Sequence, residues 1–392
     1  MTDILYLAWR YLSFHRWKTT ILVLSVTLIV FLPVGLNVLV EQSAAQLTAR
    51  AETTPLLMGA KGSPLELTLN SLYFDGTTPP PMRHAEVENI RTTGLAQPIP
   101  LHVRFAVRRH PVVGTALDYF TYRGLRFAVG RQFAVIGEAV LGAKAAQDMG
   151  VRVDDSIISS PETVFDLAGA YPLKMRVVGV LEPAMTADDN AVFVDLKTSW
   201  IMQGLGHGHQ DLRSADAVSG VMQDENGEIV ANASVVQYNE ITPDNIGDFH
   251  FHGSDDEFPI TAVIAVPNDR KSGVLLLGRF EGDDQAGQIV QPSEVIEELL
   301  GTVFTVRQFV IFAVGIVGIA TLATTVLVFL LSLRLRRRER LTLFKIGGAK
   351  SAITGILLAE VVGVVVLSVL LAAGLTLATR QFGTDIIRLF LI

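Results

Sequence analysis

Three long apolar runs restrict this chain more than any other feature of its sequence. Thr20–Val40 and Phe309–Leu333 contain no charged residue, and Ala352–Thr379 contains only Glu360. As a helix with a rise of about 1.5 Å per residue, each run can cross a hydrocarbon core of about 30 Å. The first run follows a basic segment, as in a signal peptide, but its length favours a retained anchor. We therefore predict three transmembrane helices, at 20–41, 307–333 and 352–379.

Basic residues beside these runs predict which side of the membrane each end faces. Arg10, Arg16 and Lys18 precede the first run. Seven more separate the second run from the third: Arg334, Arg336, Arg337, Arg338, Arg340, Lys345 and Lys350. Since such residues stay in the cytoplasm, the segment between the first and second runs lies outside. Glu41–Val306 has 35 acidic and 19 basic residues, so the net charge of −7 comes from the outer segment. We expect a cytoplasmic amphipathic helix at 1–19, an outer domain at 42–306 and a short outer tail at 380–392.

The outer segment has the pattern of a mixed α/β domain. Gly137–Met149 has a helical composition and is followed by Gly150, a residue type that often ends helices. A second helix is expected to start near Lys197. Stretches of strand length occur at Leu101–Val107, Lys174–Leu181, Ala191–Val194, Ser234–Tyr238 and Ile260–Val266. The region 206–256 is rich in Gly, Asp, Asn and His, which indicates loops or an inserted lobe. With no cysteine in the chain, this domain is held by its apolar core rather than by disulfides.

Two joints connect the outer segment to the apolar runs. The residues EQSAAQLTARAE, which follow the first run, are good helix formers. Before the second run, Pro292-Ser293 precedes EVIEELLGTVFTVRQF, with an N-cap and glutamates in the first helical turn. Both patterns predict helices that continue from the membrane into the outer domain. Ordinary short linkers are the alternative.

The segment 334–351 combines a short apolar pattern with charge. As a helix it would present Leu341, Leu343 and Phe344 as apolar contacts, and Gly347-Gly348 would end it. Charged side chains would form the rim of that surface: Arg338, Glu339, Arg340 and Lys345. Such a helix suits docking to a partner protein. The alternative is that the arginines only bind anionic lipid headgroups. A nucleic-acid partner is not expected, because the basic cluster lies between two membrane runs.

Six stretches, in this order, resemble the permease subunits of MacB/FtsX-like bacterial ABC transporters, which include the LolC/LolE-like mechanotransmission type. They are LAWRYLSFHRWKTTILVLSVTLIVFL, LLMGAKGSPLELTLNSLYF, FAVIGEAVLGAKAAQDMGVRVDDSI, KMRVVGVLEP, DDNAVFVDLKTSW and RRRERLTLFKIGGAKSAITGILLAE. The last stretch is similar to the family's most specific signature, a cytoplasmic loop followed by a helix with a glutamate. The chain lacks a GxxxxGK[ST] phosphate loop, since Lys350-Ser351 follows Ala349 rather than glycine.

The resemblance implies a non-catalytic, multi-pass subunit of the bacterial inner membrane with its large domain in the periplasm. Two copies would work with two copies of a separate ATPase, which binds ATP and Mg²⁺, and the helix within 334–351 would insert into that ATPase. ATP hydrolysis would move the periplasmic domain to extrude or extract a substrate, with a periplasmic or outer-membrane protein as a further partner. The family usually has a fourth span. Here about a dozen residues follow the third run, so we expect a three-span variant or a missing fourth span.

Other functions and sites remain alternatives at this point. The chain could instead regulate a periplasmic cell-wall enzyme, as in the FtsX-like branch, or belong to a zinc-linked ABC system. Glu360, inside an apolar run, is expected to be functional or paired within the helical bundle. Two His-x-His pairs with a nearby carboxylate suit zinc or copper, because residues two apart on a strand share a face. These candidate ligands are His207, His209, Asp211, His250 and His252. Solvated loop histidines are the competing interpretation.

Overall fold

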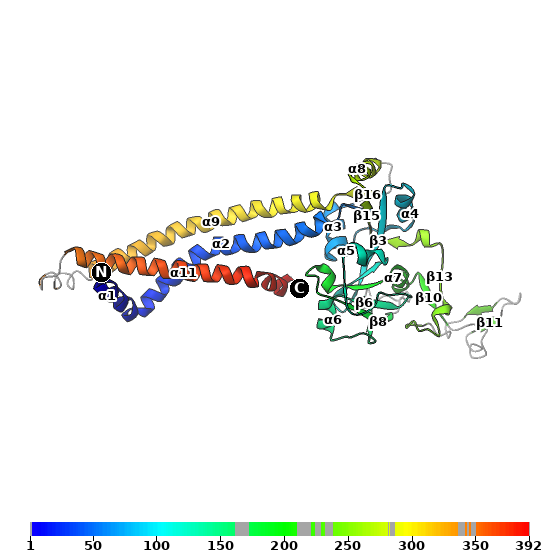
Figure 1. Cartoon of the computed structure of the whole chain (residues 1–392), viewed down its shortest axis with the longest axis horizontal. Helices are drawn as coiled ribbons and strands as arrows, with labels where there is room; N and C mark the ends of the chain where they lie inside the picture. Colours follow the sequence, from blue (N-terminus) through cyan, green and yellow to red (C-terminus); the bar gives the residue numbers. More distant parts are fainter. Residues whose placement is uncertain are drawn as a thin grey trace. The chain divides into compact units, whose positions relative to one another are not determined.

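The computed structural model describes residues 2–160, 172–209, 221–223, 229–231, 238–280, 282, 287–335, 342, 345 and 350–391. The chain forms two compact units (Figure 1). One unit is Ala49–Glu297, which contains the sheet and is called the α/β unit here. The other, the helical unit, combines Met1–Thr48 with Glu298–Ile392.

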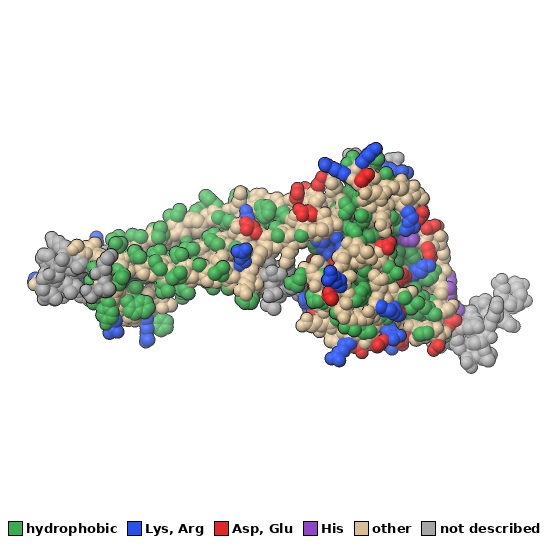
Figure 2. Space-filling view, in the orientation of Figure 1, with side chains coloured by type: hydrophobic (Ala, Val, Ile, Leu, Met, Phe, Trp, Pro, Cys, Tyr) green, Lys and Arg blue, Asp and Glu red, His purple; other side chains and the backbone are tan. Residues whose placement is uncertain are grey.

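Four helices make up most of the helical unit. They are α1 (Thr2–Phe14), α2 (Arg16–Glu52), α9 (Pro292–Leu335) and α11 (Lys350–Leu391). Three of them are long and apolar enough to cross a membrane, over Arg16–Glu52, Pro292–Val328 and Thr354–Gly383. Figure 2 shows hydrophobic side chains along the surface of these helices. The three helices predicted from the apolar runs are therefore present at the expected positions, as candidate membrane spans.

Helix α11 packs on α1 and α2 within the helical unit. Val364 is buried beside Leu22 and Val23 of α2. The Ser368 hydroxyl donates a hydrogen bond to the Val23 carbonyl at 3.2 Å, and the Thr27 hydroxyl donates to the Ser368 carbonyl at 3.3 Å. The buried hydroxyl groups of Ser368 and Thr27 thus find backbone acceptors on the neighbouring helix, as buried donors must where water is absent. Helix α11 continues to Leu391, so the segment expected as a short tail is helical up to that residue.

The two joints are helical, as the sequence predicts. Helix α2 is assigned without a break from Arg16 to Glu52, with Pro33 inside it. Helix α9 begins at Pro292 and continues through the second apolar run. The start differs slightly from expectation, since Ser293 lies in the first turn rather than at the N-cap. Proline suits this first position because its missing N–H would have no helical partner there.

The α/β unit is built on a mixed ten-stranded sheet in the order β16-β1-β15-β3-β4-β9-β6-β8-β5, with β7 paired to β8. The pairs β4–β9 and β6–β8 are parallel and the others are antiparallel. The strands are β1 (Leu56–Ala60), β3 (Ala96–Val107), β4 (His110–Thr115), β5 (Phe127–Gly130), β6 (Glu138–Leu141), β7 (Ser156–Ile158), β8 (Lys174–Leu181), β9 (Val192–Asp195), β15 (Ala262–Pro267) and β16 (Gly287–Val290). The strands expected from the sequence at 101–107, 174–181, 191–194 and 260–266 correspond to β3, β8, β9 and β15.

Within its described residues, the α/β unit also contains six short α-helices and three two-stranded ribbons. The helices are α3 (Pro64–Thr68), α4 (Ala85–Thr92), α5 (Asp118–Arg123), α6 (Ala143–Met149), α7 (Leu196–Met202) and α8 (Arg270–Arg279). The ribbons pair β2 (Met82–Arg83) with β14 (Pro259–Ile260), β10 (Gly206–Gly208) with β13 (Phe249–Phe251), and β11 (Val221–Gln223) with β12 (Ile229–Ala231). Trp200 of α7, 1% exposed, is among the largest fully buried side chains of the core.

The helix expected over Gly137–Met149 is shorter than predicted. It spans Ala143–Met149 and is capped by Gly150, whose φ of +67° is the left-handed conformation that glycine favours. The residues before it form strand β6, which lies between β8 and β9 and is buried throughout. A side chain at Gly142 would lie 2.1 Å from the Asp188 carbonyl oxygen, so only glycine fits between this strand and the helix. The helical composition of β6 was overridden by its central place in the sheet.

The region 206–256 is not made of loops alone. Strands β10 and β13 pair across it, and Phe249 and Phe251 pack against the hydrophobic core. The strand that the sequence suggests at 234–238 lies outside the described residues, except for Tyr238.

Candidate functional site

The last turn of α2 is fixed inside the α/β unit by a buried cluster, called the α2 anchor here. It comprises Arg50, Leu72, Tyr119, Thr186 and Asp188. The Arg50 guanidinium forms a bidentate pair with Asp188, at 2.6 Å from Nη1 to Oδ2 and 3.0 Å from Nη2 to Oδ1. Its Nη2 also donates to the Tyr119 hydroxyl at 3.1 Å, and its Nε donates to the Leu72 carbonyl. Four hydrogen bonds therefore hold one side chain in a single orientation.

The Asp188 carboxylate is fully enclosed by donors. It is 1% exposed and accepts hydrogen bonds from the Tyr119 hydroxyl at 2.7 Å and the Thr186 hydroxyl at 2.8 Å. Burial alone would raise the pKa of Asp188, but the Arg50 charge and these hydrogen bonds outweigh it and hold the pKa below its ordinary value. Burial and the neighbouring carboxylate raise the pKa of Tyr119, which therefore stays a donor. The anchor is thus an ion pair at neutral pH.

Helix α5 holds the end of α2 from a second direction. The Tyr122 hydroxyl donates to the Thr53 carbonyl at 2.7 Å, and Arg123 Nη2 donates to the Thr54 hydroxyl at 3.0 Å. Together with the α2 anchor, these contacts fix the chain where α2 ends and the sheet begins.

The α2 anchor was not predicted from the sequence. Arg50 lies in the helix-forming stretch EQSAAQLTARAE and Asp188 in the stretch DDNAVFVDLKTSW, and neither was expected to form an ion pair. The two residues are 138 positions apart, and no local pattern connects them. The signal in the sequence was an arginine in the last turn of a long helix. At that position its charge already interacts favourably with the helix dipole, so it does not by itself indicate an ion pair.

The two His-x-His pairs come together in the β10–β13 ribbon. His207 lies directly opposite His250 in the antiparallel register. The ring centroids are 4.8 Å apart for these two, 4.9 Å for His207 and His252, and 5.0 Å for His209 and His250. Partial burial, together with the positive charges of the neighbouring imidazoles, lowers the pKa of His207. Asp211, the fifth candidate ligand, lies outside the described residues.

Glu360 is buried in α11 and is 4% exposed within the chain. It lies one helical turn before Val364, which packs against α2. A functional role for Glu360 stays a prediction.

The candidate docking residues between α9 and α11 fall almost wholly outside the described part of the chain. Lys345 is described and is helical and exposed. The other eight are Arg338, Glu339, Arg340, Leu341, Leu343, Phe344, Gly347 and Gly348, and their docking role also stays a prediction.

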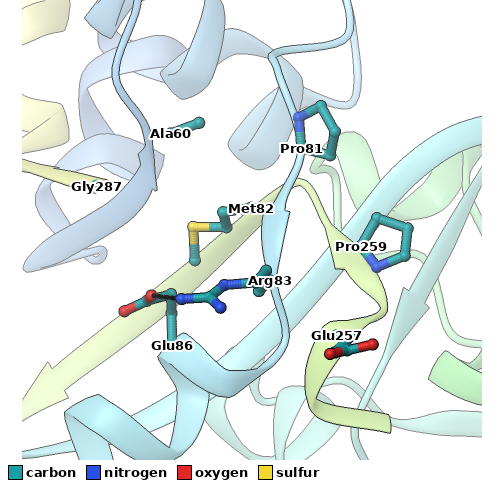
Figure 3. A pocket seen from close by; sticks show the side chains of 8 residues that line it. All are labelled: Ala60, Pro81, Met82, Arg83, Glu86, Glu257, Pro259 and Gly287. Atoms are coloured by element: carbon teal, nitrogen blue, oxygen red, sulfur yellow. Dashed lines mark ion pairs between the residues drawn. The ribbon is translucent and has the colours of Figure 1, made fainter. Parts of the chain in front are cut away.

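A pocket of about 310 Å³ opens on the α/β unit beside β2 and β14 (Figure 3). It is lined by Ala60, Pro81, Met82, Arg83, Glu86, Glu257, Pro259 and Gly287. Figure 3 shows Arg83 directed toward Glu86, and their charged atoms are 4.0 Å apart. The charged residues of the lining are Arg83, Glu86 and Glu257.

Comparisons with known proteins show the family to which this chain belongs. A family model described as the MacB-like periplasmic core domain matches residues 19–242, more than half of the chain. No curated protein matches the chain. Among solved structures, the periplasmic region of MacB from Actinobacillus actinomycetemcomitans is similar at 11% identity and a TM-score of 0.33, covering 63% of this chain and 92% of that one. The extracellular domain of the noncanonic ABC-type transporter YknZ from Gram-positive bacteria is similar at 12% identity and a TM-score of 0.30, covering 60% and 98%. The family of this chain is therefore shown by the family model, and the two solved structures add nothing to it.

Proposed function

This chain belongs to the family of MacB/FtsX-like ABC-transporter permeases, and on that premise we propose that it converts ATP hydrolysis in a separate ATPase subunit into movement of its α/β unit. In a bacterial inner membrane, that movement would extrude or extract a substrate on the periplasmic side. Two copies of the chain would work with two ATPase copies. Only 6% of the most apolar stretch of α9 is buried within the chain, which leaves helix surface for lipid and for a second copy.

The α2 anchor is the observation that carries this proposal. Helix α2 is assigned from Arg16 to Glu52 and contains the first apolar run. Its last turn is held by the bidentate Arg50–Asp188 pair. A helix resists stretching because all its backbone hydrogen bonds run along its axis. A displacement of the membrane part would therefore reach the sheet rather than be lost in a flexible linker, as a mechanical coupling requires.

The docking helix provides the test of this function. The double variant Leu341→Asp/Phe344→Asp should abolish copurification of the ATPase subunit after mild extraction, because charges would replace the apolar contacts at the centre of the interface. Membrane insertion should be unchanged, since the variant leaves all three apolar runs intact. The measurement is the amount of ATPase retained per permease chain.

A matched control adds the same two charges at neighbouring positions. Thr342→Asp/Ser351→Asp should retain the ATPase, because neither residue belongs to the apolar contact set. Unchanged ATPase recovery in the first variant, or equal loss in both, would contradict docking through Leu341 and Phe344.

Membrane topology gives a second test. Because the chain has no cysteine, single cysteines can be introduced without a background. An impermeant thiol reagent applied to intact cells with a permeabilised outer membrane should label cysteines at Asp224 and at Gln381, whose side chain is exposed. Cysteines at Ser13 and Lys350 should be protected, because the basic flanks keep those segments inside. Protection at Gln381 would contradict three membrane crossings.

A further inference from the structure

The β10–β13 ribbon has two chemically different faces. In an antiparallel pair, directly opposed residues and residues two apart along a strand point to the same side. His207 and His250 are opposed, and His209 and His252 are two residues further along their strands. All four imidazoles therefore belong to one face. Histidine side chains are visible at the surface of the α/β unit in Figure 2, on the side where Figure 1 labels β10 and β13.

The opposite face fixes the ribbon on the core. A side chain at Gly206 would lie 2.6 Å from the Phe251 ring, and one at Gly208 would lie 2.6 Å from the Phe249 ring. The glycines thus leave room for two phenylalanine rings, which pack against the hydrophobic core. Because the aromatic face packs against the core, the imidazole face is turned away from it, and the side chains that it presents are set by the sheet register.

The imidazoles on this face are close enough to share an ion. One ligand nitrogen from each of His207, His209 and His250 can be chosen so that all three lie within 4.8 Å of one another. The three side chains are half-buried, which limits their solvation and their rotamer freedom. Nδ1 of His250 lies 3.1 Å from the Asp248 carbonyl oxygen, a contact that fixes the ring and leaves Nε2 for a ligand.

His252 is placed to be a fourth ligand. Its ring centroid is 4.9 Å from that of His207 and 5.0 Å from that of His250, and its side chain is exposed. Asp255, three residues after His252, is already paired with Lys197 at 2.7 Å. The described donor set is therefore nitrogen-rich, which disfavours Mg²⁺ and Ca²⁺ and favours Zn²⁺ or Cu²⁺.

We propose that His207, His209 and His250 form a divalent transition-metal site of the zinc class, with His252 as its fourth ligand. A tetrahedral ion needs nitrogen ligands at about 2.0–2.1 Å, which small rotations of these side chains can supply. The ion would connect strands β10 and β13 across the long segment between them and so stabilise the ribbon. The exposed fourth ligand makes it an exchangeable site rather than a closed structural one. This site does not depend on the proposed transport function.

Metal titration of the full-length chain tests the site. The protein is expressed without a histidine tag, purified in detergent, stripped with a chelator, and titrated with Zn²⁺ by calorimetry. We expect one ion per chain, and Co²⁺ at the same site should give the intense visible absorption of a tetrahedral complex. A large excess of Mg²⁺ should not displace either ion. The relative response to Cu²⁺ and Zn²⁺ then identifies the preferred metal.

Three variants decide whether these histidines hold the ion. His207→Ala/His250→Ala and the milder His209→Asn should each weaken Zn²⁺ binding. Loss of an outer-shell partner costs about 10–100-fold in metal affinity, and loss of a direct ligand should cost more. His15→Ala removes an exposed histidine of the helical unit and should bind like the original chain. The fluorescence of buried Trp200, in a background with Trp9 and Trp17 replaced by phenylalanine, checks that each variant is folded. No Zn²⁺ binding by the original chain, or equal binding by folded variants, would overturn the proposal.

Discussion

The Arg50→Met variant is expected to destabilise the α/β unit by about 3–5 kcal/mol, the usual cost of breaking a buried ion pair by removing one partner. The substitution leaves the Asp188 carboxylate buried at 1% exposure without its counter-charge. The apolar stem of the arginine is largely kept by methionine, so the loss is mainly electrostatic. For a unit of this size, the midpoint of thermal unfolding should fall on the order of 10 °C. Trp200 fluorescence, with Trp9 and Trp17 replaced by phenylalanine, follows this unit alone.

Two comparisons separate the anchor from a general effect of the substitution. Arg91→Met removes the same side chain from an exposed pair with Glu88, whose side chains are 61% and 56% exposed, and should cost at most about 0.5 kcal/mol. In the double variant Arg50→Met/Asp188→Leu no buried charge is left unpaired, so its loss should be clearly smaller than the sum of the two single losses. Additive losses, or an Arg50 variant as stable as the Arg91 variant, would contradict a buried ion pair.

The three long apolar helices and the two helical joints could be predicted because their signals are local. In a bilayer an uninterrupted apolar run is stable as a helix, and helix-forming residues beside it extend that helix. Strand β9 and helix α7 were predicted for the same reason, since turn residues and Asp195, which caps α7, mark the boundary. Strand β6 was assigned to a helix because its composition carries no sign of its central position in the sheet.

The candidate sites show where such reasoning stops. The period of two in His207-x-His209 and His250-x-His252 predicts that each pair shares a face, and this holds in the ribbon. The register that places His207 opposite His250 depends on the packing of two phenylalanines, which the sequence alone does not reveal. The α2 anchor depends on a contact across 138 residues. Long-range contacts of this kind are decided by the sheet order, and that order contains crossovers that no local pattern encodes.

Between pH 7.5 and 4.5, the α/β unit is expected to lose about 2–3 kcal/mol of stability through His102 alone. His102 lies in β3, is 1% exposed, and is opposite Gly114 in the register with β4. Burial, with the charge of Arg104 adding to it, lowers the pKa of His102 to about 4 from 6.5. Because the folded pKa is the lower one, the unfolded chain binds the proton first as the pH falls below about 6.5, and stability declines until about pH 4.

Unfolding measured by Trp200 fluorescence at several pH values should show this dependence of stability on pH in the original chain. The slope should be reduced in His102→Gln, which has no titrating ring, and should persist in His15→Gln, which removes an exposed histidine. Equal slopes in all three proteins would mean that His102 is solvated or already protonated in the folded state. The packing of β3 against β4 and α7 would then be looser than in this structure.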